Sequence, residues 1–84
     1  TKTLAVELAE YNILVNTICP GYTLTELTYK NNSEEQIRNI EKDIPIQRMA
    51  RPDEIADAII YFAQDRNTYI TGQLIAVDGG FTSK

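Results

Sequence analysis

The sequence has no histidine and only one cysteine among its 84 residues. Without histidine, the chain cannot form a Ser-His-Asp triad, a Cys-His pair or a histidine metal site. One cysteine can form neither an internal disulfide nor a thiolate metal cluster, so we expect no metal site and no secreted, disulfide-stapled scaffold. Cys19 itself lies in an apolar, strand-like segment and is expected to be an inert core residue.

Basic charge and long apolar runs are also lacking. The formal net charge is −4, which argues against a nucleic acid as a partner. No segment approaches the roughly 20 consecutive apolar residues that cross a bilayer, and no signal-peptide pattern is present. We therefore expect no nucleic-acid partner, no membrane partner and a cytoplasmic location.

Phosphate-binding glycine motifs are absent as well. The chain contains neither G-x-G-x-x-G nor G-x-x-x-x-G-K-S/T, so no phosphate-cradling loop is visible. Gly79-Gly80 follows a predicted strand and is interpreted as a turn. The carboxylates on predicted helices are expected to be solvated surface charges: Glu34, Glu35, Glu41, Asp53 and Glu54.

Helical periodicity and end signals predict three helices. Residues 1–10 place apolar side chains on one face, and Tyr11-Asn12 ends that helix. Ser33 and Gln36 form a capping box that starts a second helix, whose thin apolar stripe indicates either a weakly packed flap or an ordinary exposed helix. Pro52 starts the third helix, whose broad apolar face should bury against a sheet or another subunit.

Two short strands are predicted, at 13–19 and 74–77. Both are apolar and rich in β-branched residues, which is typical of parallel strands buried on both faces. With the third helix between them, they form a βαβ unit. Two strands alone leave both sheet edges unpaired, and a chain this short is marginal by itself. Because the first helix also starts in mid-pattern at residue 1, we expect a truncated piece of a larger sheet.

The first strand runs into a Pro-Gly turn and a loop rich in Tyr and Thr. This run, from Asn16 to Thr25, reads Asn-Thr-Ile-Cys-Pro-Gly-Tyr-Thr-Leu-Thr. In open parallel sheets, ligands bind just outside the carboxyl ends of the strands. The run therefore predicts a ligand-binding strand end.

Four segments, in this order, resemble the last third of a short-chain dehydrogenase/reductase. They are Leu4–Ala9, Ile13–Gly21, Pro45–Ala56 and Ile70–Gly80. The resemblance covers nearly the whole chain and implies an α/β fold, namely the C-terminal βαβ portion of a Rossmann-like, doubly wound parallel sheet that is incomplete in this chain. Residues 1–84 would then be the C-terminal segment of a single NAD(P)-binding Rossmann-fold domain.

The resemblance also implies a cofactor site. In the family, the Pro-Gly loop holds the nicotinamide end of NAD or NADP with backbone groups and a nearby Thr hydroxyl. Carried over residue by residue, this role falls to Pro20, Gly21, Thr23 and Thr25. Gly21 would let the backbone approach a flat ring closely, and short hydroxyls can orient a carboxamide. The family often has Ile or Val at Thr23, and the alternative interpretation is that both Thr side chains only satisfy the loop.

The residues that carry out catalysis in the family have no match here. In the family, a Tyr and a Lys four residues after it act on the substrate, and none of the five Tyr residues of this chain has such a Lys. The resemblance therefore implies that the catalytic residues lie upstream of residue 1. This chain alone would not transfer a hydride.

The whole protein would interconvert a carbonyl and a secondary alcohol as a homodimer or homotetramer. Its substrate would be a small carbonyl or alcohol, or an acyl-carrier-protein thioester. The pattern around Arg48, Pro52 and Asp78-Gly79-Gly80 is similar to that of 3-oxoacyl-acyl-carrier-protein reductases, and sugar and polyol dehydrogenases share it. The other interpretation is a non-catalytic binding or dimerisation module that uses the apolar face of the third predicted helix.

Overall fold

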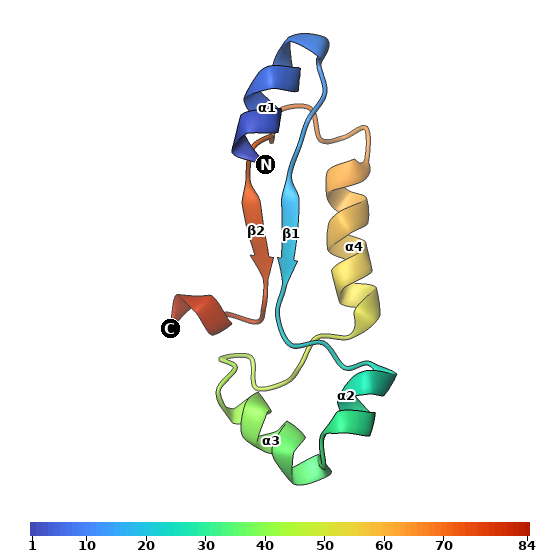
Figure 1. Cartoon of the computed structure of the whole chain (residues 1–84), viewed down its shortest axis with the longest axis vertical. Coiled ribbons are helices and arrows are strands. Elements are labelled where there is room, and N and C mark those ends of the chain that lie inside the picture. The colour runs from blue at the N-terminus through green and yellow to red at the C-terminus, as the bar shows by residue number, and fades with distance from the viewer.

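The computed structural model of the chain describes residues 1–84 and has an α/β architecture (Figure 1). In chain order, its elements are α1 (Lys2–Leu8), the 3-10 helix η1 (Ala9–Tyr11), β1 (Thr17–Pro20), α2 (Glu26–Asn31), α3 (Glu34–Lys42), α4 (Pro52–Ala63), β2 (Leu74–Val77) and the 3-10 helix η2 (Phe81–Ser83). The strands form one parallel sheet of two strands, which confirms the predicted fold class as a partial Rossmann-like fold.

The first strand begins later than its apolar pattern predicted. β1 starts at Thr17 rather than at Ile13 and pairs with β2 so that Ile18 lies opposite Ile75. Residues 13–16 lie instead beside the loop before β2, where Gly72, at a φ of 75°, donates its N–H to the Val15 carbonyl at 2.7 Å. Because the chain turns at Gly72 before β2 begins, residues 13–16 have no strand opposite them.

Asn16 ties together the segments that lead into the two strands. Its Nδ2 donates to the Ile70 carbonyl at 2.9 Å, and its Oδ1 accepts the N–H of Gln73 at 3.1 Å. The amide that interrupts the apolar run therefore aligns the starts of β1 and β2.

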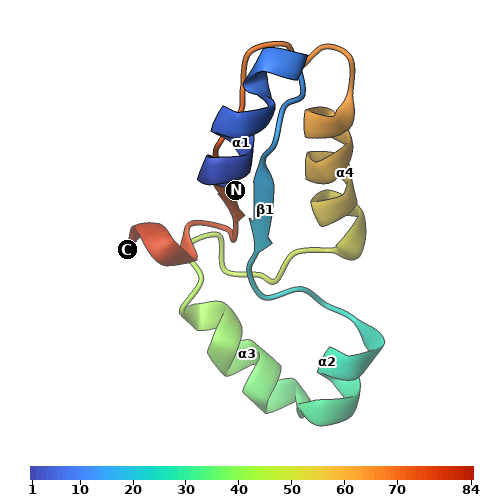
Figure 2. The same ribbon diagram turned by 45° about the horizontal axis from the view of Figure 1, so that its top comes forward.

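Helices α1 and α4 cover opposite faces of the sheet (Figures 1 and 2). Thr17 contacts Thr1, the residue that precedes α1, through the two hydroxyl groups. In contrast, Ile18 lines a groove together with Ile59 and Phe62 of α4. Because successive side chains of a strand point to opposite faces, these contacts place the two helices on the two faces. This is the layer arrangement of a doubly wound sheet.

The strands are not buried in this chain. Only four residues are buried, and they are Ala5, Ile37, Ile44 and Met49. The prediction of strands buried on both faces is therefore wrong for this chain, and Cys19 is exposed rather than part of a core. The physical reason is that two strands present two faces and two edges, and the helices of this chain cover only part of them.

The main buried cluster of the chain lies between α3 of the predicted flap and the segment that follows α3. Ile37 of α3 packs with Ile44 and Met49 while most of the helix is exposed, so an ordinary exposed helix fits α3 better than a weakly packed flap. The apolar stripe of α3 is thin, but the segment after α3 folds back over it and supplies apolar surface. Three half-buried side chains complete the cluster: Leu24, Ile40 and Phe81. The predicted capping box of α3 is confirmed, since Ser33 and Gln36 bond each other's backbone N–H.

Helix α4 begins at Pro52, as predicted, but its broad apolar face is only partly covered. Ile55 and Phe62 are half-buried, whereas Ile59 and Ile60 are 51% and 53% exposed. The single neighbouring strand β1 is too narrow to cover the whole face. Part of the predicted burial is therefore not met within these 84 residues.

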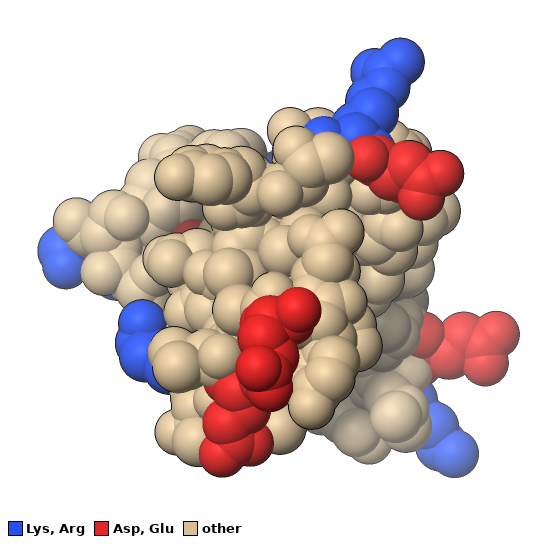
Figure 3. Space-filling view, turned by 90° about the horizontal axis from the view of Figure 1, so that it is seen from above, with Lys and Arg blue, Asp and Glu red and all other residues tan.

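Charged side chains are dispersed on the end of the molecule that is seen in Figure 3. On this face, Lys and Arg side chains lie apart from one another and do not gather into a basic patch. None of the helices combines the length and the apolar content that crossing a bilayer requires.

Candidate functional site

Pro20 and Gly21 lie where β1 ends beside β2. Pro20 pairs with Val77, and Gly21 donates its N–H to the Val77 carbonyl at 3.0 Å. A Cβ atom on Gly21 would lie 2.7 Å from the Cβ of Asp78. Glycine is therefore required here because the two strand ends approach each other closely. This reason is independent of any ligand and differs from the close approach to a flat ring that the sequence suggested.

One residue of the segment before α4 holds the loop that follows Gly21. Ala50 donates its N–H to the Tyr22 carbonyl and accepts the N–H of Leu24, both at 2.9 Å, and this forms a parallel bridge opposite Thr23. Between these two bonds, the N–H of Thr23 has no hydrogen-bond partner within the chain. The loop thus offers a backbone donor of the kind that a carboxamide oxygen requires.

The hydroxyl groups of Thr23 and Thr25 already have partners inside the loop. Thr23 Oγ1 donates to the Gly21 carbonyl at 3.1 Å. Thr25 is the N-cap of α2, a helix that the sequence analysis did not predict, and its Oγ1 accepts the N–H of Thr28 at 3.4 Å. The hydroxyl groups of both Thr residues therefore form hydrogen bonds within the loop. A hydroxyl has one proton and two lone pairs, so each also keeps capacity for a further bond.

Thr28 is a loop residue that the sequence analysis missed. Its hydroxyl donates to the Thr23 carbonyl at 2.8 Å and accepts the N–H of Thr25 at 3.2 Å. The spacing of Thr25 and Thr28 is that of a capping box in which Thr replaces the usual Glu or Gln, and this spacing could have revealed it. Thr28 joins the end of the loop to the first turn of α2.

A cavity of about 440 Å³ opens beside the strand ends. The rings of Tyr22 and Phe81, which both line it, pack edge to face with their centroids 5.6 Å apart. The full lining is Cys19, Pro20, Gly21, Tyr22, Ala76, Asp78, Phe81 and Thr82. Its volume lies within the range of about 300–1,000 Å³ that is typical of small-molecule sites. The predicted residues Pro20 and Gly21 thus border a space that can admit a flat ring.

Asp78 organises the turn after β2. Its carboxylate accepts the N–H of Gly80 at 3.0 Å, and the N–H and hydroxyl of Thr82 at 3.1 and 2.6 Å. The hydrogen bonds from Thr82 hold the pKa of Asp78 below its usual value. Gly79 and Gly80 have φ values of 62° and 90°, so the interpretation of this pair as a turn is confirmed.

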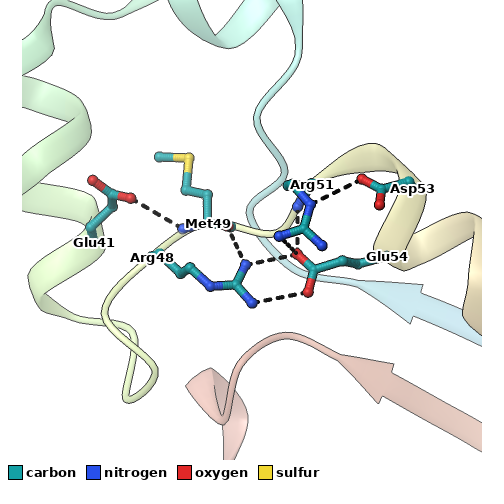
Figure 4. Close-up of polar contacts among 6 residues, drawn as sticks. All are labelled: Glu41, Arg48, Met49, Arg51, Asp53 and Glu54. Carbon is teal, nitrogen blue, oxygen red and sulfur yellow. Dashed lines mark hydrogen bonds and ion pairs between the residues drawn. The ribbon is translucent and has the colours of Figure 1, made fainter.

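Three of the helix carboxylates are not simply solvated, and for these the prediction is wrong: Glu41, Glu54, and Asp53, which accepts from Arg51 Nε at 3.2 Å (Figure 4). Glu54 binds both terminal nitrogens of Arg48, at 2.7 and 2.9 Å, and it accepts the N–H of Arg51 at 2.9 Å. The hydrogen bonds from Arg48 lower the pKa of Glu54 to about 2. Glu41 accepts the N–H of Met49 at 3.3 Å. These contacts depend on how the segment before α4 folds back, so helical periodicity could not reveal them.

The chain matches a known protein family along almost its whole length. The model of a family described as Enoyl-(Acyl carrier protein) reductase matches residues 1–82. The chain is 44% identical over 80 residues to the acetoacetyl-CoA reductase of Acinetobacter sp. (strain RA3849), with 95% of this chain and 32% of that protein covered. It is 41% identical over 80 residues to the 3-oxoacyl-acyl-carrier-protein reductase FabG of Thermotoga maritima, with 95% and 32% covered. It is 45% identical over 83 residues to the ribulose-forming D-arabinitol 2-dehydrogenase of Candida tropicalis, with 95% and 29% covered.

Solved structures share the same fold. A short chain dehydrogenase family protein from Francisella tularensis superimposes with a TM-score of 0.91 at 40% identity, covering 100% of this chain and 39% of that one. YwfH, an NADPH-dependent reductase involved in bacilysin biosynthesis, superimposes with a TM-score of 0.87 at 29% identity, covering 99% and 35%. The chain spans about a third of the length of the curated relatives it matches. Agreement of the family model, the sequences and the folds shows that the chain belongs to the short-chain dehydrogenase/reductase family.

Proposed function

We propose that residues 1–84 form the C-terminal segment of a single NAD(P)-binding Rossmann domain in an oxidoreductase. The enzyme interconverts a carbonyl and a secondary alcohol by hydride transfer. The observation that carries this proposal is the loop from Pro20 to Thr25, which follows a parallel strand, borders a cavity with Pro20, Gly21 and Tyr22, and contains the unpartnered N–H of Thr23. The carboxyl end of a parallel strand is the usual position of a bound dinucleotide.

In this proposal, the chain binds and orients the nicotinamide end of NAD or NADP. The backbone of Pro20 and Gly21 borders the ring, the Thr23 N–H donates to the carboxamide oxygen, and the Thr25 hydroxyl adds a bond to the same group. Fixed orientation of the ring determines which face meets the substrate. The bound nicotinamide supplies or accepts the hydride. No residue of this chain acts on the substrate proton, and that task falls to a Tyr and a Lys elsewhere in the whole protein.

The relatives support a proposal for the substrate class. Their names describe reduction of acetoacetyl-CoA, reduction of a 3-oxoacyl-acyl carrier protein and oxidation of D-arabinitol to ribulose. Each reaction converts a carbonyl and a secondary alcohol into each other, so this reaction type is the common element. We favour a 3-oxoacyl thioester as the substrate and a homodimer or homotetramer as the assembly. The flap from Leu24 to Asp43 would then shape the substrate pocket beside the nicotinamide loop.

The variant Thr25→Val tests the proposal in the full-length protein. Val keeps the shape of Thr but removes the hydroxyl that caps α2 and faces the end of the loop, a loss of about 1 kcal/mol for the cap alone. We expect affinity for the whole dinucleotide to fall about tenfold, which corresponds to about 1.4 kcal/mol. Affinity for ADP-ribose, which lacks the nicotinamide, should stay the same. Both affinities can be measured by isothermal titration calorimetry.

Thr25→Ser is the matched control, because serine keeps the capping hydroxyl. Its affinity for the dinucleotide should match that of the natural protein. If Thr25→Val weakens ADP-ribose as much as the dinucleotide, or weakens neither, the loop does not hold the nicotinamide end and the proposed function is wrong.

A non-catalytic binding or dimerisation module is the second candidate. It is favoured by exposed apolar side chains on α4 and β2, since Ile59, Ile60 and Leu74 are 51%, 53% and 58% exposed. The intact mass of the natural protein separates the two candidates. The oxidoreductase requires about 27 kDa, the mass of roughly 250 residues in one α/β domain. A mass of 9.5 kDa, that of these 84 residues, would leave only the module.

A further inference from the structure

The segment that holds the nicotinamide loop has little regular structure of its own. Residues 43–51 contain no helix or strand, and Gln47 has a left-handed φ of 66°. A non-glycine residue in this conformation persists only where the surrounding contacts fix it. The contacts of this segment therefore decide where Ala50 lies, and Ala50 holds the loop.

Glu54, in the first turn of α4, accepts three of the hydrogen bonds that hold this segment, and Glu41 accepts another, from the N–H of Met49 at 3.3 Å (Figure 4). Its two carboxylate oxygens bind the two terminal nitrogens of Arg48, which fixes the guanidinium in one plane. The same carboxylate accepts the N–H of Arg51 at 2.9 Å. Arg48 Nη1 also donates to the Met49 carbonyl at 3.2 Å. The Met49 carbonyl, through Arg48, and the N–H of Arg51 are thus both connected to the Glu54 carboxylate, whereas the N–H of Met49 is held by Glu41.

Ala50 transmits this position to the loop. Its N–H and carbonyl form the two 2.9 Å bonds to Tyr22 and Leu24, and the unpartnered N–H of Thr23 lies between them. A shift of Ala50 would move the Thr23 donor by a similar amount. Hydrogen bonds weaken steeply when the donor is misdirected, so a small shift would affect a carboxamide bond.

We propose that Arg48 and Glu54 are positioning residues for the nicotinamide end of the cofactor, acting through the backbone of Ala50. The inference rests on the proposed function. It assigns control of the affinity for the dinucleotide to two residues that do not touch the cofactor. The pair raises the affinity for the whole dinucleotide and does not change the affinity for its adenosine half.

A second ion pair of this chain is an ordinary surface pair and serves as a comparison. Glu34 and Arg38 approach only to 3.9 Å, with side chains 91% and 65% exposed. Such pairs contribute little to stability. The Arg48 and Glu54 side chains are 46% and 29% exposed, and two hydrogen bonds join them. In addition, the Glu54 carboxylate accepts the backbone N–H of Arg51. Geometry and exposure therefore separate the positioning pair from the ordinary one.

Substitution at both ends of the pair tests the inference in the full-length protein. Arg48→Met keeps the aliphatic stem and removes the guanidinium, and we expect affinity for the dinucleotide to fall about tenfold, with affinity for ADP-ribose unchanged. Glu54→Gln keeps an oxygen for the Arg51 N–H but loses the charge, so its effect should be smaller, about threefold. Arg48→Lys should restore part of the lost affinity, because Lys keeps the charge but makes a single-point contact. Arg38→Met is the matched control and should change neither affinity.

The ratio of the two affinities decides the outcome. If Arg48→Met lowers both affinities equally, or lowers neither, the positioning role is wrong. If Arg48→Met prevents folding, the affinities for the dinucleotide and for ADP-ribose are measured in Glu54→Gln instead. An unchanged ratio of these two affinities in Glu54→Gln overturns the inference. The result for Thr25→Val separates this failure from that of the proposed function. If Thr25→Val alone lowers the affinity for the dinucleotide selectively, with no selective loss in the Arg48 and Glu54 variants, the proposed function of the loop stands. In that case only the positioning role of Arg48 and Glu54 is wrong.

Discussion

Met49→Ala is expected to lower the free energy of unfolding of the full-length protein by about 2–5 kcal/mol. Met49 is only 2% exposed and packs with Ile37 and Ile44, the other buried members of its cluster. Truncation to Ala removes three heavy atoms and leaves a cavity that rigid neighbours close only in part. Urea titration followed by far-UV circular dichroism measures the change.

The control for this prediction is Leu27→Ala in α2. Leu27 is 65% exposed, so its truncation removes little buried surface and should change the free energy of unfolding by less than about 0.5 kcal/mol. Equal effects of the two substitutions would contradict the assignment of the core to the cluster around Met49. Since Met49 directly precedes Ala50, the same variant should also weaken dinucleotide binding.

Gly21→Val is expected to destabilise the protein by about 1–3 kcal/mol or more and to abolish dinucleotide binding in the accessible concentration range. The new Cβ would lie 2.7 Å from Asp78 Cβ and 2.8 Å from Asp78 Cα. These atoms belong to backbone or lie next to it, so they cannot rotate away as the end of a long side chain could. The strand ends must separate, which breaks the bond from Gly21 N–H to the Val77 carbonyl. Thermal unfolding and cofactor titration together measure both effects.

Tyr22→Phe is the control at the next position. The Tyr22 side chain is 48% exposed, and the substitution preserves the ring that packs against Phe81. We expect its melting temperature and its affinity for the dinucleotide to match those of the natural protein. A stable Gly21→Val variant that binds the dinucleotide normally would show that the two strand ends are not held as close as the structure indicates.

Local signals in the sequence were sufficient for the element boundaries that depend on neighbouring residues. Pro52 starts α4, the Ser33 and Gln36 pair caps α3, and β2 occupies Leu74–Val77 as predicted. Each of these signals acts within about one turn of helix or along one extended segment, so it can be recognised without knowing the fold. The same holds for the end of β1, which lies at the Pro-Gly run as predicted.

Local sequence patterns do not reveal the contacts that shape the site. Thr28 could have been found from its spacing to Thr25, but the pairing of Ala50 with the loop joins segments that no periodicity relates. The stripe of α3 left two interpretations open, because it describes one helix and not the chain that folds over it. The expectation for Cys19 failed because burial of a strand depends on neighbours that these 84 residues do not contribute.

The sequence by itself determined the α/β class, the parallel βαβ order, the family and the location of the loop from Pro20 to Thr25. Only the tertiary structure decided that Gly21 is required by Asp78, that Met49 packs in the main buried cluster, and that Arg48 and Glu54 form a pair. The physical reason is the range of the interactions. Caps, turns and periodicity arise between residues within a few positions of one another, whereas close packing and ion pairing depend on which distant segments the fold brings together.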